Sequence, residues 1–159
     1  MDLEGLKKAF GSAFTKYDTD PAKQHFTLAW RRDLEIVEAT KLGDSSARIV
    51  YRFPVTNEYL NPSGGFHGGA AATFLDIGTS FLLVMIARPG FWPSGGTSRT
   101  LNVTYLRPAK EGEMLRMECE IVHVGKRLCL LKGAILREKD GAVVSVCEHN
   151  KVNLDNSKV

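Results

Sequence analysis

The chain has 159 residues, of which 43% are hydrophobic and 25% are charged, and its formal net charge is +3 at pH 7. This length suffices to bury one substantial core, so we expect a single domain over residues 1–159, with its core at about residues 32–153. The small, dispersed charge excludes the clustered basic surface that is typical of nucleic-acid binding.

The spacing of cysteines and histidines indicates neither disulfides nor a metal site. The three cysteines lie in strand-like segments without Cys-x-x-Cys spacing, so we expect buried free thiols in a reducing compartment. The histidines, His149 among them, are isolated and give no zinc-ligand pattern. The first ten residues contain early acids and no apolar stretch, unlike a signal or transit peptide. We therefore expect a cytoplasmic protein, with the mitochondrial matrix as an alternative.

The N-terminal part of the chain predicts a helix followed by a hairpin. Apolar residues recur at helical spacing over residues 2–17, which indicates an amphipathic N-terminal helix. A connector containing proline follows at residues 18–24. Strand-like runs at residues 34–41 and 47–55, separated by turn residues at 43–45, then predict a β-hairpin.

A glycine-rich loop at residues 59–69 leads into a long apolar segment. Only Gly78 interrupts a helix over residues 69–88, and Pro89 follows its end. A helix of this length spans about 30 Å, which would suffice to cross a membrane. Asp76 near its middle argues against insertion, so we expect no membrane span and instead a buried central helix.

The two faces of this helix differ in character. One face is apolar and is expected to pack on a sheet; it carries Phe74, Leu75, Phe81, Leu82, Met85 and Ile86. The other face is expected to line something polar; it carries Ala72, Thr73, Asp76, Thr79 and Ser80.

The last third of the chain is strand-like almost throughout. Four runs, at residues 97–106, 114–124, 127–137 and 143–153, are separated by turn signals. We expect these four strands to meander in chain order. The whole chain is then predicted to be an α+β domain, in which a curled antiparallel sheet covers the central helix.

The glycine-rich loop and the helix start form a candidate anion site. Gly68 and its neighbouring glycines allow close backbone approach, and a helix N-terminus presents unpaired N–H donors with a partial positive charge. Such a site would stabilise an anion or a developing oxyanion. No phosphate-loop or dinucleotide fingerprint accompanies it.

Asp76 is the second candidate, because an acid in an apolar helix costs free energy unless it is paired or used. It lies eight residues beyond Gly68, or about 12 Å along the helix. Catalytic contacts need about 3 Å, so both groups can act on one carbonyl only if they come from two copies of the chain. A two-fold dimer with antiparallel central helices would join them. The alternative is a structural acid hydrogen-bonded to serine or threonine.

A nucleophilic triad has little support. His67, Ser98 and Asp76 could compose one on paper, but the Gly-x-Ser-x-Gly elbow is missing from the sequence. We favour a loop histidine at position 67 that orients its neighbours.

Taken together, these residues resemble the hotdog-fold acyl-CoA thioesterases. The pattern comprises Asn61, His67 in His-Gly-Gly, Asp76 nine residues later, Ser98, Asn-Val-Thr-Tyr at residues 102–105 and Pro-Ala-Lys-x-Gly at residues 108–112. The likeness is to the phenylacetate-type (PaaI-like) branch, which includes the acyl-CoA thioesterase 13 group, and it extends over about residues 32–152.

The resemblance implies a hotdog fold, in which a six-stranded antiparallel sheet wraps around the long helix, here with an extra N-terminal helix. It also implies a homodimer that shares a continuous sheet, often as a dimer of dimers. The implied activity is hydrolysis of acyl-CoA or acyl-carrier-protein thioesters to free acid and thiol. No cofactor is implied apart from the coenzyme A of the substrate.

The resemblance also implies roles for the residues of the pattern. Asp76 would be the general base or the nucleophile, and the N–H of Gly68 would form the oxyanion hole. Asn61 and His67 would orient substrate or water, and Ser98 would hold the water near Asp76.

Further residues are expected to contact the substrate. The acyl chain would pass along the helix near Phe66, Phe74 and Leu82, and the phosphates of coenzyme A would meet basic loop residues. The expected contacts are Gly69, Phe66, Thr79, Arg107, Lys110, Lys126 and Arg127. The segment at residues 88–96, which contains Trp92, is bulkier than the family pattern and is a candidate to reshape the acyl tunnel.

Two other functions are possible on the same fold. A non-catalytic acyl-CoA binding module would have no use for Asp76 and Asn61. A hotdog dehydratase or hydratase would require a histidine and a second acid placed to move protons on carbon, which the spacing of His67 and Asp76 fits poorly.

Overall fold

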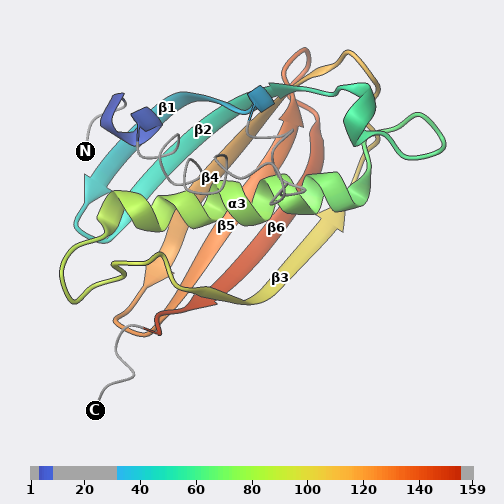
Figure 1. Cartoon of the computed structure of the whole chain (residues 1–159). Coiled ribbons are helices and arrows are strands. Elements are labelled where there is room, and N and C mark those ends of the chain that lie inside the picture. The colour runs from blue at the N-terminus through green and yellow to red at the C-terminus, as the bar shows by residue number, and fades with distance from the viewer. Residues whose placement is uncertain (1–3, 9–31, 155–159) are drawn as a thin grey trace, which may run out of the picture.

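The computed structural model of the chain describes residues 4–8 and 32–154 (Figure 1). Residues 4–8 are helical. The rest of the N-terminal helix predicted over residues 2–17, and the connector after it, lie outside the described residues.

The described chain forms six strands, one long helix and a short 3-10 turn. In chain order these are β1 (Glu35–Gly43), β2 (Ser46–Pro54), η1 (Asn57–Tyr59), α3 (Gly68–Ile86), β3 (Thr97–Tyr105), β4 (Met114–Val124), β5 (Leu128–Arg137) and β6 (Val143–Val152). The predicted strands and central helix are confirmed, and their predicted ends agree to within two residues.

The strands form one antiparallel sheet in the order β1-β2-β4-β5-β6-β3, and α3 lies across one face of it (Figure 1). This arrangement confirms the α+β hotdog fold. The predicted four-strand meander is wrong, however, because only β4, β5 and β6 follow one another. α3 carries the chain from β2 over the sheet to its far edge, so β3 pairs with β6 and β2 pairs with β4.

The apolar face of α3 packs against the sheet as predicted. All six of its predicted apolar residues are buried. Gly78 allows the closest approach, since a Cβ there would collide with Cε of Met117 on β4. The hydroxyl of Tyr51 on β2 donates a hydrogen bond to the carbonyl of Gly78 at 2.9 Å. The glycine that interrupts the helical sequence pattern is therefore explained by helix–sheet packing.

By length and composition alone, α3 could cross a membrane, and it is the one such helix among the described residues. In the fold, 56% of that apolar window is buried. The apolar character of α3 is therefore accounted for by its central place in the core.

β3 is an open edge of the sheet. Seven of its nine residues are exposed and the other two, Leu101 and Val103, are half-buried. Tyr105 at its end and Leu106 just beyond it are 55% and 50% exposed. An exposed strand edge with neighbouring apolar side chains is a surface on which another strand can pair.

The segment after α3 is anchored at the opposite end of the helix. Trp92 is fully buried and its indole N–H donates a hydrogen bond to the carbonyl of Gly125, in the β4–β5 turn, at 2.8 Å. Arg88 stacks over the ring of Phe91 at 4.0 Å. The bulk of this segment thus closes one end of the core.

Candidate active site

Asn61 organises the glycine-rich loop. Its side-chain oxygen accepts hydrogen bonds from the N–H groups of Ser63 at 3.0 Å and Gly65 at 3.1 Å. Its backbone N–H donates to the carbonyl of Gly65 at 2.8 Å. The sequence Asn-Pro-Ser-Gly-Gly therefore folds as a turn around the asparagine side chain, which fixes the path of the chain into α3.

His67 caps the N-terminus of α3. Its Nδ1 accepts a hydrogen bond from the N–H of Gly69 at 2.8 Å, so the neutral ring carries its proton on Nε2. The N–H of Gly69 is thereby used within the helix cap. The N–H of Gly68 has no acceptor among the described residues. Gly68 thus presents a free donor at the positive end of the helix dipole.

Gly68 and Asn61 line one open pocket of about 390 Å³, together with Phe66, Tyr105 and Arg107. Phe66 is largely buried, with its ring centroid 6.0 Å from that of Phe74 on α3. The pocket therefore combines an apolar wall, a helix N-terminus and a cation. Such a combination suits a polar, partly anionic group attached to an apolar chain.

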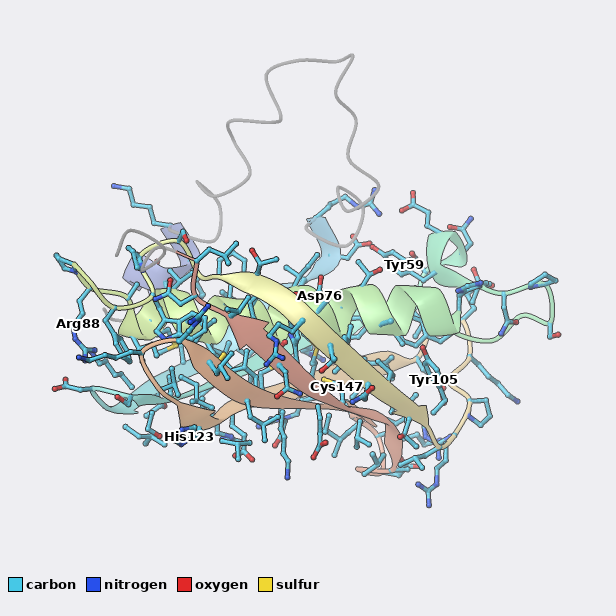
Figure 2. All side chains as sticks on the ribbon, turned by 90° about the horizontal axis from the view of Figure 1, so that it is seen from below. Tyr59, Asp76, Arg88, Tyr105, His123 and Cys147 are labelled. Atoms are coloured by element: carbon cyan, nitrogen blue, oxygen red, sulfur yellow. The ribbon has the colours of Figure 1, made fainter. Side chains whose placement is uncertain are left out.

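Asp76 lies midway along α3, on the side that faces β3 (Figure 2). Its side chain is 44% exposed. Oδ1 accepts a hydrogen bond from the hydroxyl of Ser98 on β3 at 3.2 Å and lies 3.3 Å from Nε2 of His149. Among the described residues only this oxygen has partners. Oδ2 is therefore open to a water molecule or a substrate.

His149 connects Asp76 to the protein interior. The ring is fully buried, with Nδ1 2.7 Å from the hydroxyl oxygen of Thr79 and Nε2 2.8 Å from that of Ser98. Two proton arrangements satisfy this chain. In one, Thr79 donates to His149, His149 to Ser98 and Ser98 to Asp76. In the other, Ser98 donates to His149, His149 to Thr79 and Thr79 to the carbonyl of Leu75, 2.7 Å away.

The first proton arrangement directs every hydrogen bond toward Asp76, and a carboxylate there favours it electrostatically. His149 is uncharged in both arrangements. Burial, aided by the nearby ammonium group of Lys151, lowers the pKa of His149 to about 4, although Asp76 acts in the opposite direction. At neutral pH, His149 is therefore a neutral relay that holds Ser98 in place.

His149 and Lys151 are the site residues that sequence reasoning missed. They lie more than 70 positions after Asp76, and no local motif links them to it. The sequence shows only that Cys147, His149 and Lys151 occupy alternate positions of a strand-like run and so point to one face, and the structure shows that this face is buried. Buried polar residues that face a helix carrying an acid indicate a network.

Thr79 was expected to contact the substrate. It is fully buried and lies against His149, not in the open pocket. Its contact is therefore with the relay.

The four basic residues expected to meet coenzyme A form two groups. Arg107 lines the Gly68 pocket, and Lys110 pairs by a β-bridge with Gly65. Lys126 and Arg127 lie in the β4–β5 turn, whose carbonyls accept hydrogen bonds from Asn153. That turn is at the other end of α3, next to Trp92. One chain therefore cannot bring all four to one ligand.

The two half-sites are likewise separate within one chain. Gly68 is the first residue of α3 and Asp76 is its ninth, which places them about 12 Å apart along the axis. Figure 2 shows this separation, with Tyr105 near the start of the helix and Asp76 at its middle. No group of three or more metal-ligating side chains occurs among the described residues.

Another concavity, of about 510 Å³, lies away from α3. It is lined by outward-facing charged side chains of the sheet, such as Arg48, Glu118, Lys132 and Glu148. Arg48 and Glu118 form an ion pair at 2.8 Å. These charges compensate one another at the surface, so the chemistry is assigned to α3 and β3.

An antiparallel sheet that wraps around one long central helix is the hotdog fold, and in this chain the helix carries an acid and has a free N–H at its start. Residues 63–144 match the family model of the thioesterase superfamily, and the chain belongs to this family. His149 and Lys151 lie beyond the matched residues.

The individual relatives share about a quarter of their aligned residues with this chain. Acyl-coenzyme A thioesterase 13 of Mus musculus is 26% identical over 119 residues, which are 75% of this chain and 82% of that protein. The Homo sapiens protein of the same name is 26% identical over 112 residues, 70% of this chain and 77% of that protein.

Solved structures share the fold. Zebrafish thioesterase superfamily member 2 superposes with a TM-score of 0.77 at 22% identity, covering 96% of this chain and 98% of the other. The E. coli PaaI protein, from the phenylacetic acid degradation operon, gives 0.66 at 17% identity and 96% coverage of both. A Streptococcus pneumoniae thioesterase protein crystallised with coenzyme A gives 0.63 at 24% identity, covering 76% and 89%.

Proposed function

We propose that this thioesterase hydrolyses acyl-CoA or acyl-carrier-protein thioesters to free acid and thiol, with Asp76 as general base. The observation that carries the proposal is the geometry of Asp76. One carboxylate oxygen is held by Ser98, and the other is open at a half-exposed position. The names of the curated relatives and the coenzyme A in the pneumococcal structure support the substrate class.

In the proposed reaction, Oδ2 of Asp76 accepts a proton from a water molecule whose oxygen attacks the thioester carbon. The carbonyl oxygen becomes an oxyanion, which the N–H of Gly68 and the helix N-terminus stabilise. Collapse of the tetrahedral intermediate breaks the carbon–sulfur bond. The proton held on Asp76 then passes to the thiolate, which leaves the free acid, the thiol and the regenerated carboxylate.

This reaction requires two subunits, because Gly68 and Asp76 are too far apart in one. We propose a two-fold homodimer in which α3 of each subunit lies antiparallel to its counterpart. The open edge of β3 and the exposed side chains of Tyr105 and Leu106 support pairing at this edge. Each dimer would then contain two equivalent sites.

The same dimer gives the basic residues a common role. In antiparallel helices, the end of one α3 extends past the start of the other. The β4–β5 turn of one subunit, with Lys126 and Arg127, would then approach the loop of the other, with Arg107 and Lys110. We propose that these cations together bind the phosphates of coenzyme A.

The test is hydrolysis of a panel of acyl-CoAs of varied chain length and aromaticity, measured through the release of free thiol. Asp76→Asn retains the shape and hydrogen bonds of the side chain but cannot act as base. We expect it to lower kcat by about 10²–10⁴-fold while coenzyme A still binds. Undiminished turnover would refute the assignment of Asp76. A wild-type protein that binds every acyl-CoA and hydrolyses none would instead indicate a binding module.

A further inference from the structure

A lysine is buried beside the Asp76 network. Lys151 on β6 is 5% exposed, and its ammonium group donates a hydrogen bond to the hydroxyl of Ser80 at 2.8 Å and to that of Ser98 at 3.5 Å. Ser80 in turn donates to the backbone carbonyl of Asp76 at 2.7 Å. Among residues 4–8 and 32–154, the side-chain hydrogen-bond partners of this cation are thus two neutral hydroxyls. A buried ammonium group with so few partners costs folding free energy.

The titratable groups that face Lys151 come from three elements. Asp76 approaches it from α3, His149 lies two residues before it on β6, and Cys129 pairs with it from β5. β3 contributes only the neutral Ser98 at this point. Burial lowers the pKa of Lys151, whereas Asp76 and Cys129 act in the opposite direction. Lys151 is therefore the cation of a compact cluster that also contains one carboxyl group, one imidazole and one thiol.

The cation has its clearest effect on His149. A protonated His149 would present a charged Nε2–H group 3.3 Å from Oδ1 of Asp76. The resulting ion pair would neutralise the carboxylate that has to accept a proton from water. A positive charge held at Lys151 opposes this protonation by repulsion.

We propose that Lys151 is a positioning residue whose charge keeps His149 neutral and Asp76 unpaired, so that the site stays active on the acid side of neutrality. This inference rests on the proposed thioesterase function. It assigns no contact between Lys151 and the substrate. It goes beyond the family match, which ends at residue 144.

Substitutions can separate a purely structural role of Lys151 from a role of its charge. An apolar side chain of similar length would fill the space of Lys151 without the cost of burying an ammonium group. We therefore expect Lys151→Met to fold with at least the stability of the wild type, as measured by chemical denaturation. Lys151→Arg retains the charge. Ser80→Ala retains Lys151 and removes its 2.8 Å partner, and it is the matched control for the lost hydrogen bond.

The experiment combines two readouts in wild type, Lys151→Met, Lys151→Arg and Ser80→Ala. NMR titration of the imidazole of His149 needs no activity. In Lys151→Met we expect the His149 pKa to rise by about one unit from its wild-type value, and in the other two variants to stay near that value. In the pH profile of kcat/KM for the best acyl-CoA substrate, the acid limb should move to higher pH by the same amount in Lys151→Met. It should stay in place in the other two variants.

Two results would overturn the proposal. One is an unchanged His149 pKa in a folded and active Lys151→Met variant. The other is a raised His149 pKa with the acid limb left in place. A wild-type protein that hydrolyses no thioester would contradict the proposed function itself, and the NMR titration, which does not depend on turnover, keeps that failure separate from failure of the Lys151 inference.

Discussion

The hydroxyl of Tyr105 donates a hydrogen bond to the carbonyl oxygen of Gly68 at 2.9 Å, which brings the Tyr105 ring close to this residue. A Cβ added at Gly68 would be 3.2 Å from that ring. The end of β3 thus holds the first turn of α3 in place. This contact fixes the position of the free N–H to which we assign the oxyanion.

Gly68→Pro is expected to lower kcat by about 10²–10³-fold, because it removes this N–H donor. Proline is well tolerated at the first position of a helix, and His67 before it has the extended ψ of 131° that a following proline requires. Steady-state kinetics on an acyl-CoA measures the loss. Gly68→Ala is the matched control, since it meets the same Tyr105 ring but retains the N–H. Equal losses in the two variants would show that crowding, not the donor, is responsible.

Because of His149, the free energy of unfolding should decrease as the pH is lowered. Its pKa in the folded protein is about 4, below its ordinary value of 6.5. Between these values the unfolded chain binds a proton that the folded chain does not. The free energy of unfolding therefore has its full value above about pH 6.5. It decreases by about 3 kcal/mol in total as the pH falls toward 4.

Urea denaturation of wild type and His149→Gln over this pH range isolates the effect of His149, since glutamine does not titrate. The wild-type free energy of unfolding should decrease more steeply toward pH 4 than that of the variant. Parallel curves for the two proteins would mean that His149 titrates near its ordinary pKa in the fold.

Gly96 and Gly95 provide a matched pair for the packing of Trp92. Both have positive φ, +65° and +73°. A Cβ at Gly96 would lie 2.5 Å from the Trp92 ring and 2.6 Å from the carbonyl of Val152, whereas at Gly95 it would meet nothing within 4 Å. We expect Gly95→Ala to cost about 1 kcal/mol from backbone strain alone. Gly96→Ala should cost about 3 kcal/mol, because overpacking adds to the strain. Thermal denaturation that ranks the two equally would contradict this packing.

Most of the fold could be predicted from the sequence, because strand alternation and the length of the apolar helix are local signals. The strand order could not. Whether β3 pairs with β4 or β6 depends on where α3 delivers the chain, which is a property of the whole sheet. The meander was the simpler expectation, and the helix crossover overrides it.

The candidate site, like the fold, could be predicted from the sequence only in part. Asp76 and Gly68 were predicted because each departs from a local pattern, as an acid in an apolar helix and as a glycine-rich helix start. His149 and Lys151 follow the ordinary alternation of a strand, and only the pairing of β6 with β3 brings them to Ser98 and Asp76. Local patterns do not encode such long-range contacts.

The central claim is that Gly68 of one subunit and Asp76 of another act on the same thioester. Mixed dimers of Asp76→Ala and Gly68→Pro test it most directly, with the two variants co-expressed under different tags. Each variant alone should be nearly inactive. In a random mixture about half of the dimers contain one copy of each variant, and each such dimer has one intact site of two. Activity should therefore recover to about a quarter of the wild-type value. A mixture no more active than its parents would contradict the shared site.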